Sequence, residues 1–322
     1  MDGIGAAAGG GPLIFDRSTG HVDGANLIDR AVLLALQAGS IVTQPFGHRG
    51  YRLGCQTLAS IAAKRDIIIR LNEDAVLAVP FCDGYWSRLL NRRYHYEEEI
   101  EALLRSLAND RYFFIDCGAN FGYWSVLTSS LPFGGQTTLA VEASQTNVVR
   151  LAENARLNGS RFRYLNAAMS GGRGFARIVG HRHEKFETIA LEQSEPGAVE
   201  RITLDAVALQ GLADPSLPVL VKLDVEGVEI EVLEGGSALS KRDTLFICEE
   251  HGSDRTHSVS RYLLELMEQR LYAFDPVEGR FIRLVGLDQL DRLKKHSWVG
   301  YNVFATSSLL WEARLRSVRW RP

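Results

Sequence analysis

The sequence predicts an α/β fold with a Rossmann-like, mainly parallel sheet of seven strands, and three observations lead to it. A short apolar run, Tyr112 to Ile115, ends at Asp116 and is followed by a glycine-containing turn and a helix-like segment. A second apolar run, from Thr138, ends in an acid at Glu142. The run Val219 to Leu223 is almost continuously apolar, as expected of a strand that is covered on both faces.

Size and composition indicate a globular protein with one large domain and additions. The chain has 322 residues, of which 46% are hydrophobic and 23% are charged. Its formal net charge of -3 does not favour a dedicated nucleic-acid binder, for which a basic balance is expected. The four cysteines lack the paired spacing of metal ligands, which favours a reduced, cytoplasmic setting. The start resembles neither a signal peptide nor a transit peptide, and the apolar stretch at 31–38 is far shorter than the roughly 20 residues of a membrane span.

The chain divides into three predicted parts: an N-terminal extension and cap at 1–92 with a disordered tip at 1–12, a main domain at 93–310, and a basic tail at 311–322. In the first part, apolar residues at helical spacing predict an amphipathic helix over 26–38 that is bounded by Gly39. Strands at 66–71 and 75–80 are predicted to form a hairpin. Because both elements precede the first strand of the main sheet, we expect them to form a cap or lid.

The main domain is predicted to open with a helix from Tyr94 to Leu107, whose acidic first turn favours the positive end of the helix dipole. Its first residues, Tyr94 to Glu97, are candidates for ligand contact or for a packed cap.

The turn after Asp116 has the composition of a ligand site. Gly118 and Gly122 lack a Cβ, so the backbone there can adopt unusual dihedral angles and a ligand can approach closely. A dinucleotide-binding turn requires G-x-G-x-x-G, whereas this turn reads D-x-G-x-N-x-G, with Asn120 in the place of the second glycine. Glu142 can accept two hydrogen bonds from a ribose diol. One acid for an ammonium group and one for a ribose favour S-adenosylmethionine over NAD; the alternative is an ordinary strand-turn-helix without a ligand.

The segments after Glu142 continue the alternation of helix and strand. A helix at 145–158 leads to a strand at 161–165 that ends in Asn166-Ala167-Ala168, near the position of an adenine in a doubly wound sheet. Residues 171–202 interrupt the alternation with short strands at 175–179 and 188–191. The tip at 181–185 offers acceptor contacts or forms a solvated turn, and it lacks the third spaced ligand of a metal site.

Acidic residues crowd the ends of the next two strands. Asp224-Val-Glu226-Gly-Val-Glu229 follows the strand at 219–223, and Glu249-Glu-His251 follows the strand at 244–248. Asp224 and His251 are therefore predicted to rise from neighbouring strands at one edge of the sheet. Carboxylates crowded in this way repel one another unless cations, metals or hydrogen-bond donors offset them.

The remaining segments complete the sheet. A helix at 259–269 and strands near 271–274, 281–284 and 301–305 are predicted. The arginine- and tryptophan-containing tail is suited to contact nucleic acid or an anionic membrane surface, or to end as a packed or solvated segment.

These motifs together resemble the FkbM family of S-adenosylmethionine-dependent methyltransferases. The resemblance covers about residues 90–255, with the motifs in the family's order. Its specific part is the D-x-E-G-x-E stretch, because very many methyltransferases share the glycine turn. The matching stretches are Phe114-Ile-Asp-Cys-Gly-Ala-Asn-Phe-Gly-Tyr-Trp-Ser125, Val141-Glu-Ala143, Asn166-Ala-Ala168, Thr203-Leu-Asp205, Val221-Lys-Leu-Asp-Val-Glu-Gly-Val-Glu229 and Glu249-Glu-His251.

The resemblance implies a class I methyltransferase fold with strand order 3-2-1-4-5-7-6 and methyl transfer to a hydroxyl. Acceptors in the family are typically sugars of glycans or glycolipids, or hydroxyls of polyketide-like metabolites, so we expect a small-molecule or glycan acceptor and no nucleic acid. Carried over by position, the residues expected to bind the donor are Asp116, Gly118, Asn120, Gly122, Ser125, Glu142, Ala143, Asn166 and Ala167. The residues expected on the acceptor side are Asp224, Glu226, Glu249 and His251.

Two chemistries fit the acceptor side. A hydroxyl must lose its proton as the new bond forms, which requires a base such as His251 or Asp224. In the alternative, Asp224 and Glu249 hold a divalent metal ion that lowers the pKa of the hydroxyl. Lys222 is expected either to take part at this edge or to pair with one of the acids as a structural partner.

Three other functions fit the sequence less well than methyl transfer to a hydroxyl. A nucleic-acid methyltransferase would use the basic tail, but enzymes that methylate base nitrogens usually carry D/N-P-P-Y/F where this chain has Asp224-Val-Glu-Gly, and acids there would repel phosphates. A non-catalytic S-adenosylmethionine-binding scaffold would be supported by loss of the acceptor-side acids, which are all present. An NAD oxidoreductase is disfavoured by the glycine spacing.

Overall fold

The computed structural model describes residues 11–320 except residues 184, 213, 295 and 297. The chain forms two compact units, which divide between Tyr96 and Glu97. Residues 1–10 of the predicted disordered tip and the last two residues of the predicted tail lie outside the described residues.

The first unit combines a four-stranded sheet with two helices. The strand order is β2-β1-β3-β4, in which β1 and β3 are parallel and the other pairs are antiparallel. The pair β3–β4 confirms the predicted hairpin; the role of this unit as a cap stays a prediction. Its elements are β1 (Leu13–Asp16), β2 (Val22–Asp23), α1 (Leu27–Thr43), η1 (Gln44–Phe46), α2 (Tyr51–Ala59), β3 (Asp66–Asn72), β4 (Ala75–Pro80) and η2 (Trp86–Leu90).

Helix α1 begins where the sequence predicts but does not end there. Asn26 and Asp29 form a reciprocal capping box at its start. The predicted end before Gly39 is wrong, because the helix continues to Thr43. A Cβ at Gly39 would lie 3.4 Å from the ring of Tyr51 in α2. The glycine therefore gives room for the packing of α2 rather than ending the helix.

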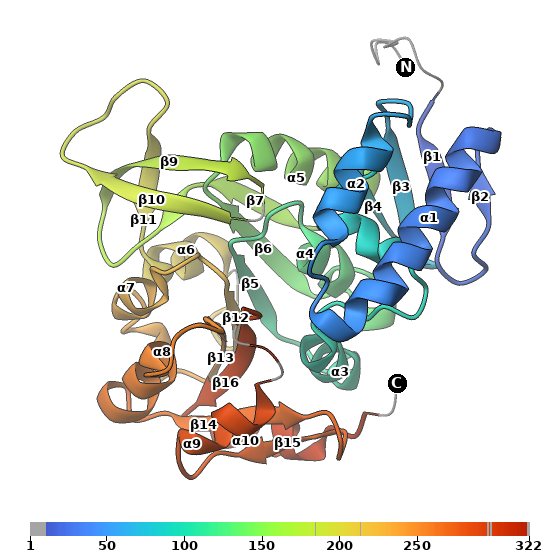
Figure 1. The fold of residues 1–322 in the computed structure, drawn as a ribbon. Helices are drawn as coiled ribbons and strands as arrows, with labels where there is room; N and C mark the ends of the chain where they lie inside the picture. The colour runs from blue at the N-terminus through green and yellow to red at the C-terminus, as the bar shows by residue number, and fades with distance from the viewer. Residues whose placement is uncertain (1–10, 184, 213, 295, 297, 321–322) are drawn as a thin grey trace. The chain divides into compact units, whose positions relative to one another are not determined.

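The second unit is built on an eight-stranded sheet in the order β15-β14-β16-β13-β12-β5-β6-β7 (Figure 1). Strands β13, β12, β5, β6 and β7 are parallel, whereas β16 and β15 run antiparallel to their neighbours. The strands are β5 (Phe113–Cys117), β6 (Thr137–Glu142), β7 (Arg163–Asn166), β12 (Val219–Leu223), β13 (Thr244–Glu250), β14 (Arg270–Asp275), β15 (Arg280–Arg283) and β16 (Tyr301–Thr306).

The predicted α/β class is confirmed, but the predicted count of seven strands is wrong. Strand β15 adds an eighth strand at the edge of the sheet, where it pairs only with β14 among the described strands. Its Phe281 packs against Phe274 and Phe304, with ring centroids 5.3 and 4.6 Å apart. These aromatic contacts hold the hairpin of β14 and β15 on the sheet.

Helices cover both faces of this sheet. On one face, Leu204 of α6, Val232 of α7 and Leu263 of η5 are buried in the same apolar cluster as Ile115 and Val221. In the described part of the chain, no helix has both the length and the apolar character needed to cross a bilayer. The helical segments are α3 (Glu98–Ser106), α4 (Tyr123–Thr128), η3 (Leu131–Phe133), α5 (Gln145–Leu157), α6 (Leu204–Gly211), α7 (Glu229–Glu234), η4 (Leu239–Lys241), α8 (Ser258–Arg261), η5 (Tyr262–Leu266), α9 (Asp288–Leu293) and α10 (Leu309–Ser317).

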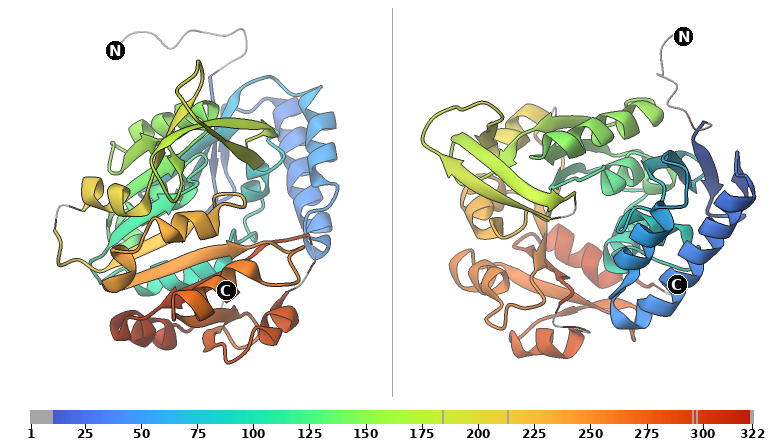
Figure 2. Two further views of the ribbon diagram at one scale, coloured as in Figure 1. Left: turned by 90° about the vertical axis from the view of Figure 1, so that its left-hand side faces the viewer. Right: turned by 45° about the horizontal axis from the view of Figure 1, so that its top comes forward.

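A second, smaller sheet accounts for the interruption predicted at 171–202. Its order is β10-β9-β11-β8, and β9 and β10 form an antiparallel hairpin. Figures 1 and 2 show the far end of this hairpin reaching away from the eight-stranded sheet, whereas the turn between β9 and β10 is directed back toward the loop after β5. Its strands are β8 (Ala168–Met169), β9 (Gly174–Arg182), β10 (Lys185–Leu191) and β11 (Val199–Ile202).

Candidate active site

The carboxyl ends of the parallel strands bring Asp224, Glu249 and His251 to one edge of the sheet. Lys222 is in register with Asp116 on β5 and with Ile247 on β13. Because side chains alternate along a strand, Asp224 and Glu249 follow on the same face at this edge. Strands β12 and β13 are adjacent and parallel, so Asp224 and His251 follow neighbouring strands at this edge, as predicted.

Lys222 lies at the centre of the acidic residues. Its side chain is buried, and its Nζ lies 2.9 Å from Asp224 Oδ2 and 3.9 Å from Glu97 Oε2. Burial disfavours the ammonium, but the charges of Asp224, Glu97 and Asp116 outweigh burial and raise the pKa of Lys222 well above its ordinary value. Lys222 therefore carries a positive charge that offsets the crowded carboxylates.

Asp224 and Glu249 differ in protonation. A hydrogen bond joins their side chains. Burial and the charge of Asp224 raise the pKa of Glu249 well above its ordinary value. For Asp224, burial is outweighed by Lys222 and by the hydrogen bond from Glu249, so that its pKa is lowered. Asp224 is thus the ionised partner, and Glu249 is the protonated donor.

The start of α3 adds two acids to this cluster. Trp124 Nε1 donates to Glu97 Oε2 over 2.6 Å, and Asn302 Nδ2 donates to Glu97 Oε1 over 3.0 Å and to Glu99 Oε1 over 2.8 Å. Burial and the charge of Glu97 raise the pKa of Glu99 to about 7. The predicted helix start at Tyr94 is wrong because Glu97 has a left-handed φ of 47°, and α3 begins after it. No spacing in the sequence predicts that Glu99 and Asn302 belong to this cluster.

Asp116 faces the protein's own polar groups. Ser125 Oγ donates to Asp116 Oδ2 over 2.6 Å, and both side chains are buried. Burial raises the pKa of Asp116, and the charge of Lys222 opposes that shift. Two residues that the sequence assigns to the donor are therefore bonded to each other beneath the turn.

The two glycines of the turn have the backbone angles predicted for them, with φ of 79° at Gly118 and 87° at Gly122. The prediction that the missing Cβ atoms make room for a ligand is only partly right. A Cβ at Gly118 would lie 1.8 Å from the carbonyl oxygen of Asp224, and one at Gly122 would lie 2.6 Å from Leu151 Cδ1. The close approach at both positions is made by the chain itself, which seats the turn against β12 and α5.

Glu142 has the hydrogen-bonding capacity that a ribose diol requires. Its Oε2 accepts the N–H of Asn120 over 2.8 Å, and its Oε1 accepts the N–H of Ser144 over 2.7 Å. The Asn147 side chain also donates to this carboxylate, and because a carboxylate has about four acceptor sites, capacity for a further hydrogen bond remains. Burial raises the pKa of Glu142 to about 7, although the two backbone hydrogen bonds oppose the shift.

Hydrogen bonds from Asn166 and Ala167 join the end of β7 to the end of β6. Asn166 Nδ2 donates to the carbonyl oxygens of Glu142 and Ala143 over 3.0 and 3.1 Å. The N–H of Ala167 donates to the Glu142 carbonyl over 3.1 Å. Through these bonds, Asn166 and Ala167 position the backbone that carries the Glu142 carboxylate.

His183, in the turn between β9 and β10, lies beside the glycine turn. Its carbonyl oxygen accepts hydrogen bonds from Asn120 Nδ2 over 2.6 Å and from Asn147 Nδ2 over 2.8 Å. Its ring stacks on Phe121 with centroids 4.7 Å apart. The sequence offers the tip at 181–185 only as an acceptor contact or a solvated turn, because the separation of more than 60 residues from Asn120 hides this contact.

The D-x-E-G-x-E stretch forms the turn from β12 into α7. Glu226 and Gly227 both have positive φ, 53° and 94°, and Glu226 is partly buried. The N–H of Gly227 donates to both carboxylate oxygens of Glu229 over 3.1 Å. Glu229 therefore stabilises the turn that follows Asp224.

The metal alternative has no support in the described residues, among which no group of three or more His, Cys, Asp or Glu side chains is arranged to hold an ion. Lys222 contacts Asp224 directly, and Glu249 keeps a proton. The ammonium and this proton thus offset the negative charge of the two acids.

The methyltransferase FkbM domain is matched over residues 116–274. None of the curated proteins matches the chain. The chain is similar to the solved structure of methyltransferase FkbM from Methylobacillus flagellatus KT, with 14% identity and a TM-score of 0.38, over 61% of this chain and 44% of that one.

Two further solved structures are similar at the same level. Precorrin-6y C5,15-methyltransferase from Geobacter metallireducens GS-15 has 13% identity and a TM-score of 0.38, over 67% of this chain and 91% of that one. Pyrococcus abyssi tRNA (uracil-54, C5)-methyltransferase, in complex with S-adenosyl-L-homocysteine, has 9% identity and a TM-score of 0.37, over 76% of this chain and 44% of that one. The chain thus spans less than half the length of the Methylobacillus and Pyrococcus proteins.

Proposed function

Because this chain belongs to the FkbM methyltransferase family through residues 116–274, we propose that it transfers a methyl group from S-adenosylmethionine to a hydroxyl of a sugar, in a glycan, a glycolipid or a glycosylated metabolite. One observation carries the proposal: the hydrogen-bonded pair of Asp224 and Glu249, with His251 beside it, lies at the strand edge next to the glycine turn and Glu142.

The residues around the turn fit the donor. S-adenosylmethionine, when bound, supplies a methyl group that its positively charged sulfur has already activated. Glu142 keeps acceptor capacity for a ribose hydroxyl beyond its bonds to Asn120, Ser144 and Asn147. The acids around Lys222 outnumber it, so this edge favours a cationic ligand. With an activated donor, the main tasks left to the protein are to position the acceptor and to take up its proton.

His251 is the better candidate for the base. Asp224 is bound by Lys222 and Glu249, and its lowered pKa makes it a weak proton acceptor. The imidazole of His251 has a suitable intrinsic basicity, and an ionised Asp224 nearby stabilises the imidazolium that forms. We therefore assign proton uptake to His251 and the positioning of its ring to Asp224.

The acidic acceptor side supports a sugar over a nucleic acid. Asp224 accepts hydrogen bonds and the protonated Glu249 can donate one, which suits the hydroxyl groups of a sugar. The same acids would repel the phosphates of a nucleic acid.

Incubation of the full-length protein with methyl-labelled donor and a panel of glycans, glycolipids, RNA and DNA tests this function, with the product mass as the readout. We expect label on a glycan or glycolipid. His251→Ala should lower kcat by about 100-fold or more while donor affinity, measured by calorimetry, stays unchanged.

The control is His21→Ala, which changes an exposed histidine of the first unit and should leave kcat unaltered. Label on RNA or DNA would contradict the proposal in favour of a nucleic-acid enzyme. Donor binding without transfer to any acceptor would favour the scaffold, and an unchanged kcat in His251→Ala would remove the base assignment.

A further inference from the structure

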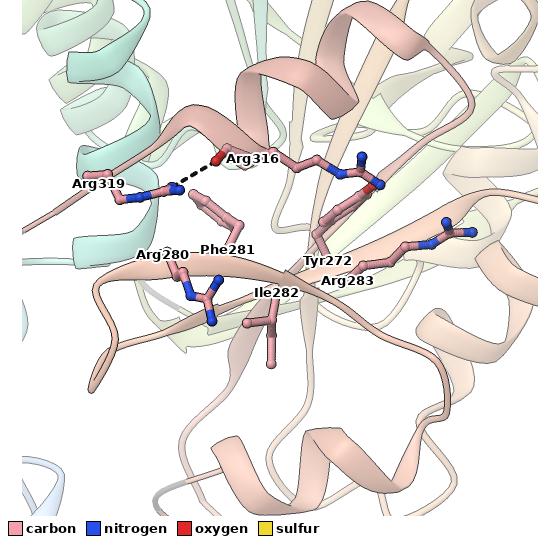
Figure 3. Close-up of a pocket in the computed structure, with 7 residues that line it drawn as sticks. All are labelled: Tyr272, Arg280, Phe281, Ile282, Arg283, Arg316 and Arg319. Atoms are coloured by element: carbon pink, nitrogen blue, oxygen red, sulfur yellow. Dashed lines mark hydrogen bonds between the residues drawn. The ribbon is translucent and has the colours of Figure 1, made fainter.

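A pocket lies at the β15 edge of the eight-stranded sheet, between the β14–β15 hairpin and the end of α10 (Figure 3). Its volume is about 380 Å³, which is in the size range of small-molecule sites. Strands β14, β16 and β13 separate β15 from β12, so the pocket is distinct from the candidate active site. Its lining includes the arginines Arg280, Arg283, Arg316 and Arg319 and the aromatic residues Tyr272 and Phe281.

The backbone of the chain fixes the walls of this pocket. After α10, the N–H of Trp320 donates to the carbonyl oxygen of Gly279 over 2.8 Å, in the turn between β14 and β15. Gly279 has φ of 62°, and a Cβ there would lie 2.0 Å from the Trp320 carbonyl oxygen. The predicted basic tail is therefore docked on the hairpin as far as Trp320, and its arginines are held beside those of β15.

The arginines of the pocket exceed the acids that pair with them. Arg280 pairs with Glu278, and Arg316 pairs with Glu312. Glu312 also pairs with Arg270, with Nε and Oε2 2.8 Å apart, so this one carboxylate serves two guanidinium groups.

The other two arginines form no ion pair within residues 11–320 as far as these are described, although the charge of Arg283 acts on Glu312. Arg283 is exposed, and it lies in register with Tyr272 across the hairpin. Arg319 Nη1 donates to the carbonyl oxygens of Arg316 and Val318, both over 2.7 Å, which fixes its side chain but leaves its charge in place. The positive charge around this small pocket thus exceeds the negative charge, because Glu312 alone faces Arg270, Arg283 and Arg316.

We propose that this pocket binds the phosphate group of a phosphorylated ligand. A guanidinium presents a planar fork of donors that matches phosphate oxygens, and a phosphate dianion carries more negative charge than a carboxylate with which to offset an excess of arginines. Tyr272, Phe281 and Ile282 also line the pocket beside the arginines. The ligand is either a soluble phosphate ester or the headgroup of an anionic phospholipid.

Calorimetry with inorganic pyrophosphate and the full-length protein at low salt tests binding at this pocket. Arg283→Gln should weaken the affinity about tenfold or more, because Arg283 is exposed and its loss breaks no ion pair of the described structure. Arg283→Lys keeps the charge without the fork and should have an intermediate affinity. The matched control is Arg292→Gln, since Arg292 is exposed on α9, outside the pocket lining, and should not affect binding.

Sedimentation with vesicles separates the two sources of phosphate. Vesicles of phosphatidylcholine with phosphatidic acid are compared with vesicles of phosphatidylcholine alone. Binding of pyrophosphate without vesicle binding supports a soluble ester, and vesicle binding that Arg283→Gln lowers at least tenfold supports a lipid headgroup. The proposal is overturned if neither probe binds, or if Arg283→Gln and Arg292→Gln bind either probe equally well.

Discussion

At the level of single residues, Lys222 determines how the acids of the candidate active site share their charge. Its ammonium lies against Asp224, which stays ionised, while Glu249 on the next strand keeps a proton. Removal of water raises the pKa of each buried acid, and one buried cation can offset only part of that effect. The cluster therefore holds an ionised acid and a protonated acid side by side, in hydrogen-bonding contact.

Glu142 leads to a prediction about donor binding. We expect Glu142→Gln to weaken the affinity for S-adenosylhomocysteine by about 10- to 100-fold, because hydrogen bonds to a charged carboxylate are worth about 1.5 to 3 kcal/mol. The pKa of Glu142 is raised to about 7, so the wild-type affinity should fall as the pH drops from 8 to 6 and the carboxylate takes up a proton. Calorimetry at pH 6 and pH 8 measures both effects.

Glu142→Gln also serves as the control for the pH effect. Because glutamine does not titrate between pH 6 and pH 8, the donor affinity of this variant should change less with pH than that of the wild type. Equal pH dependence in the two proteins would argue that another group controls donor binding.

At the level of elements, the end of β5 and the end of β12 are joined backbone to backbone. The N–H of Asp224 donates to the carbonyl oxygen of Cys117 over 3.1 Å, and the Asp224 carbonyl occupies the space next to Gly118. The glycine turn and the acidic edge are thus held together as one piece. A change in one strand end moves both the donor side and the acceptor side.

Gly118→Ala should therefore destabilise the second unit strongly. The added Cβ would lie 1.8 Å from a backbone oxygen, at a residue whose φ is 79°. We expect the free energy of unfolding to fall by about 3 kcal/mol or more, since a backbone clash adds to the strain of a left-handed alanine. Urea unfolding followed by circular dichroism measures the loss.

Gly135→Ala is the matched control. Gly135 also has positive φ, 58°, but nothing lies within 4 Å of its Cβ position. Its replacement should cost only about 1 kcal/mol, the strain of the left-handed conformation. Similar losses in the two variants would show that the contact with Asp224 contributes nothing.

At the level of the whole molecule, the raised pKa of Glu99 links stability to pH. A glutamate in the unfolded chain releases its proton near pH 4.5, whereas burial and the charge of Glu97 keep the proton on Glu99 up to about pH 7. Its contribution to stability is full below pH 4.5 and is lost as the pH rises through 7. Between pH 5 and pH 8 this loss amounts to about 2 kcal/mol.

Glu99→Gln should remove this part of the pH dependence, because glutamine can keep the hydrogen bond from Asn302 without titrating. Urea unfolding of both proteins at pH 5 and pH 8 gives the comparison. If the wild type and the variant lose the same free energy between these two pH values, Glu99 is not protonated in the folded protein.

The sequence by itself determines the local parts of this protein. Asp116, the glycines at positive φ and Glu142 at a strand end follow from spacing and turn chemistry, as do the class of the fold and the hairpin β3–β4. Each of these features depends on residues a few positions apart, where helical or strand periodicity decides which side chains share a face.

Only the tertiary structure decides which distant residues meet. Strand register places Lys222 between Asp116 of β5 and Ile247 of β13, and chain folding brings His183 onto Phe121 and Trp320 onto Gly279. It also shows that the space beside Gly118 is taken by Asp224, not by a ligand. These contacts join segments from 25 to 106 residues apart, and their geometry follows from the packing of whole strands and helices, which no local spacing encodes.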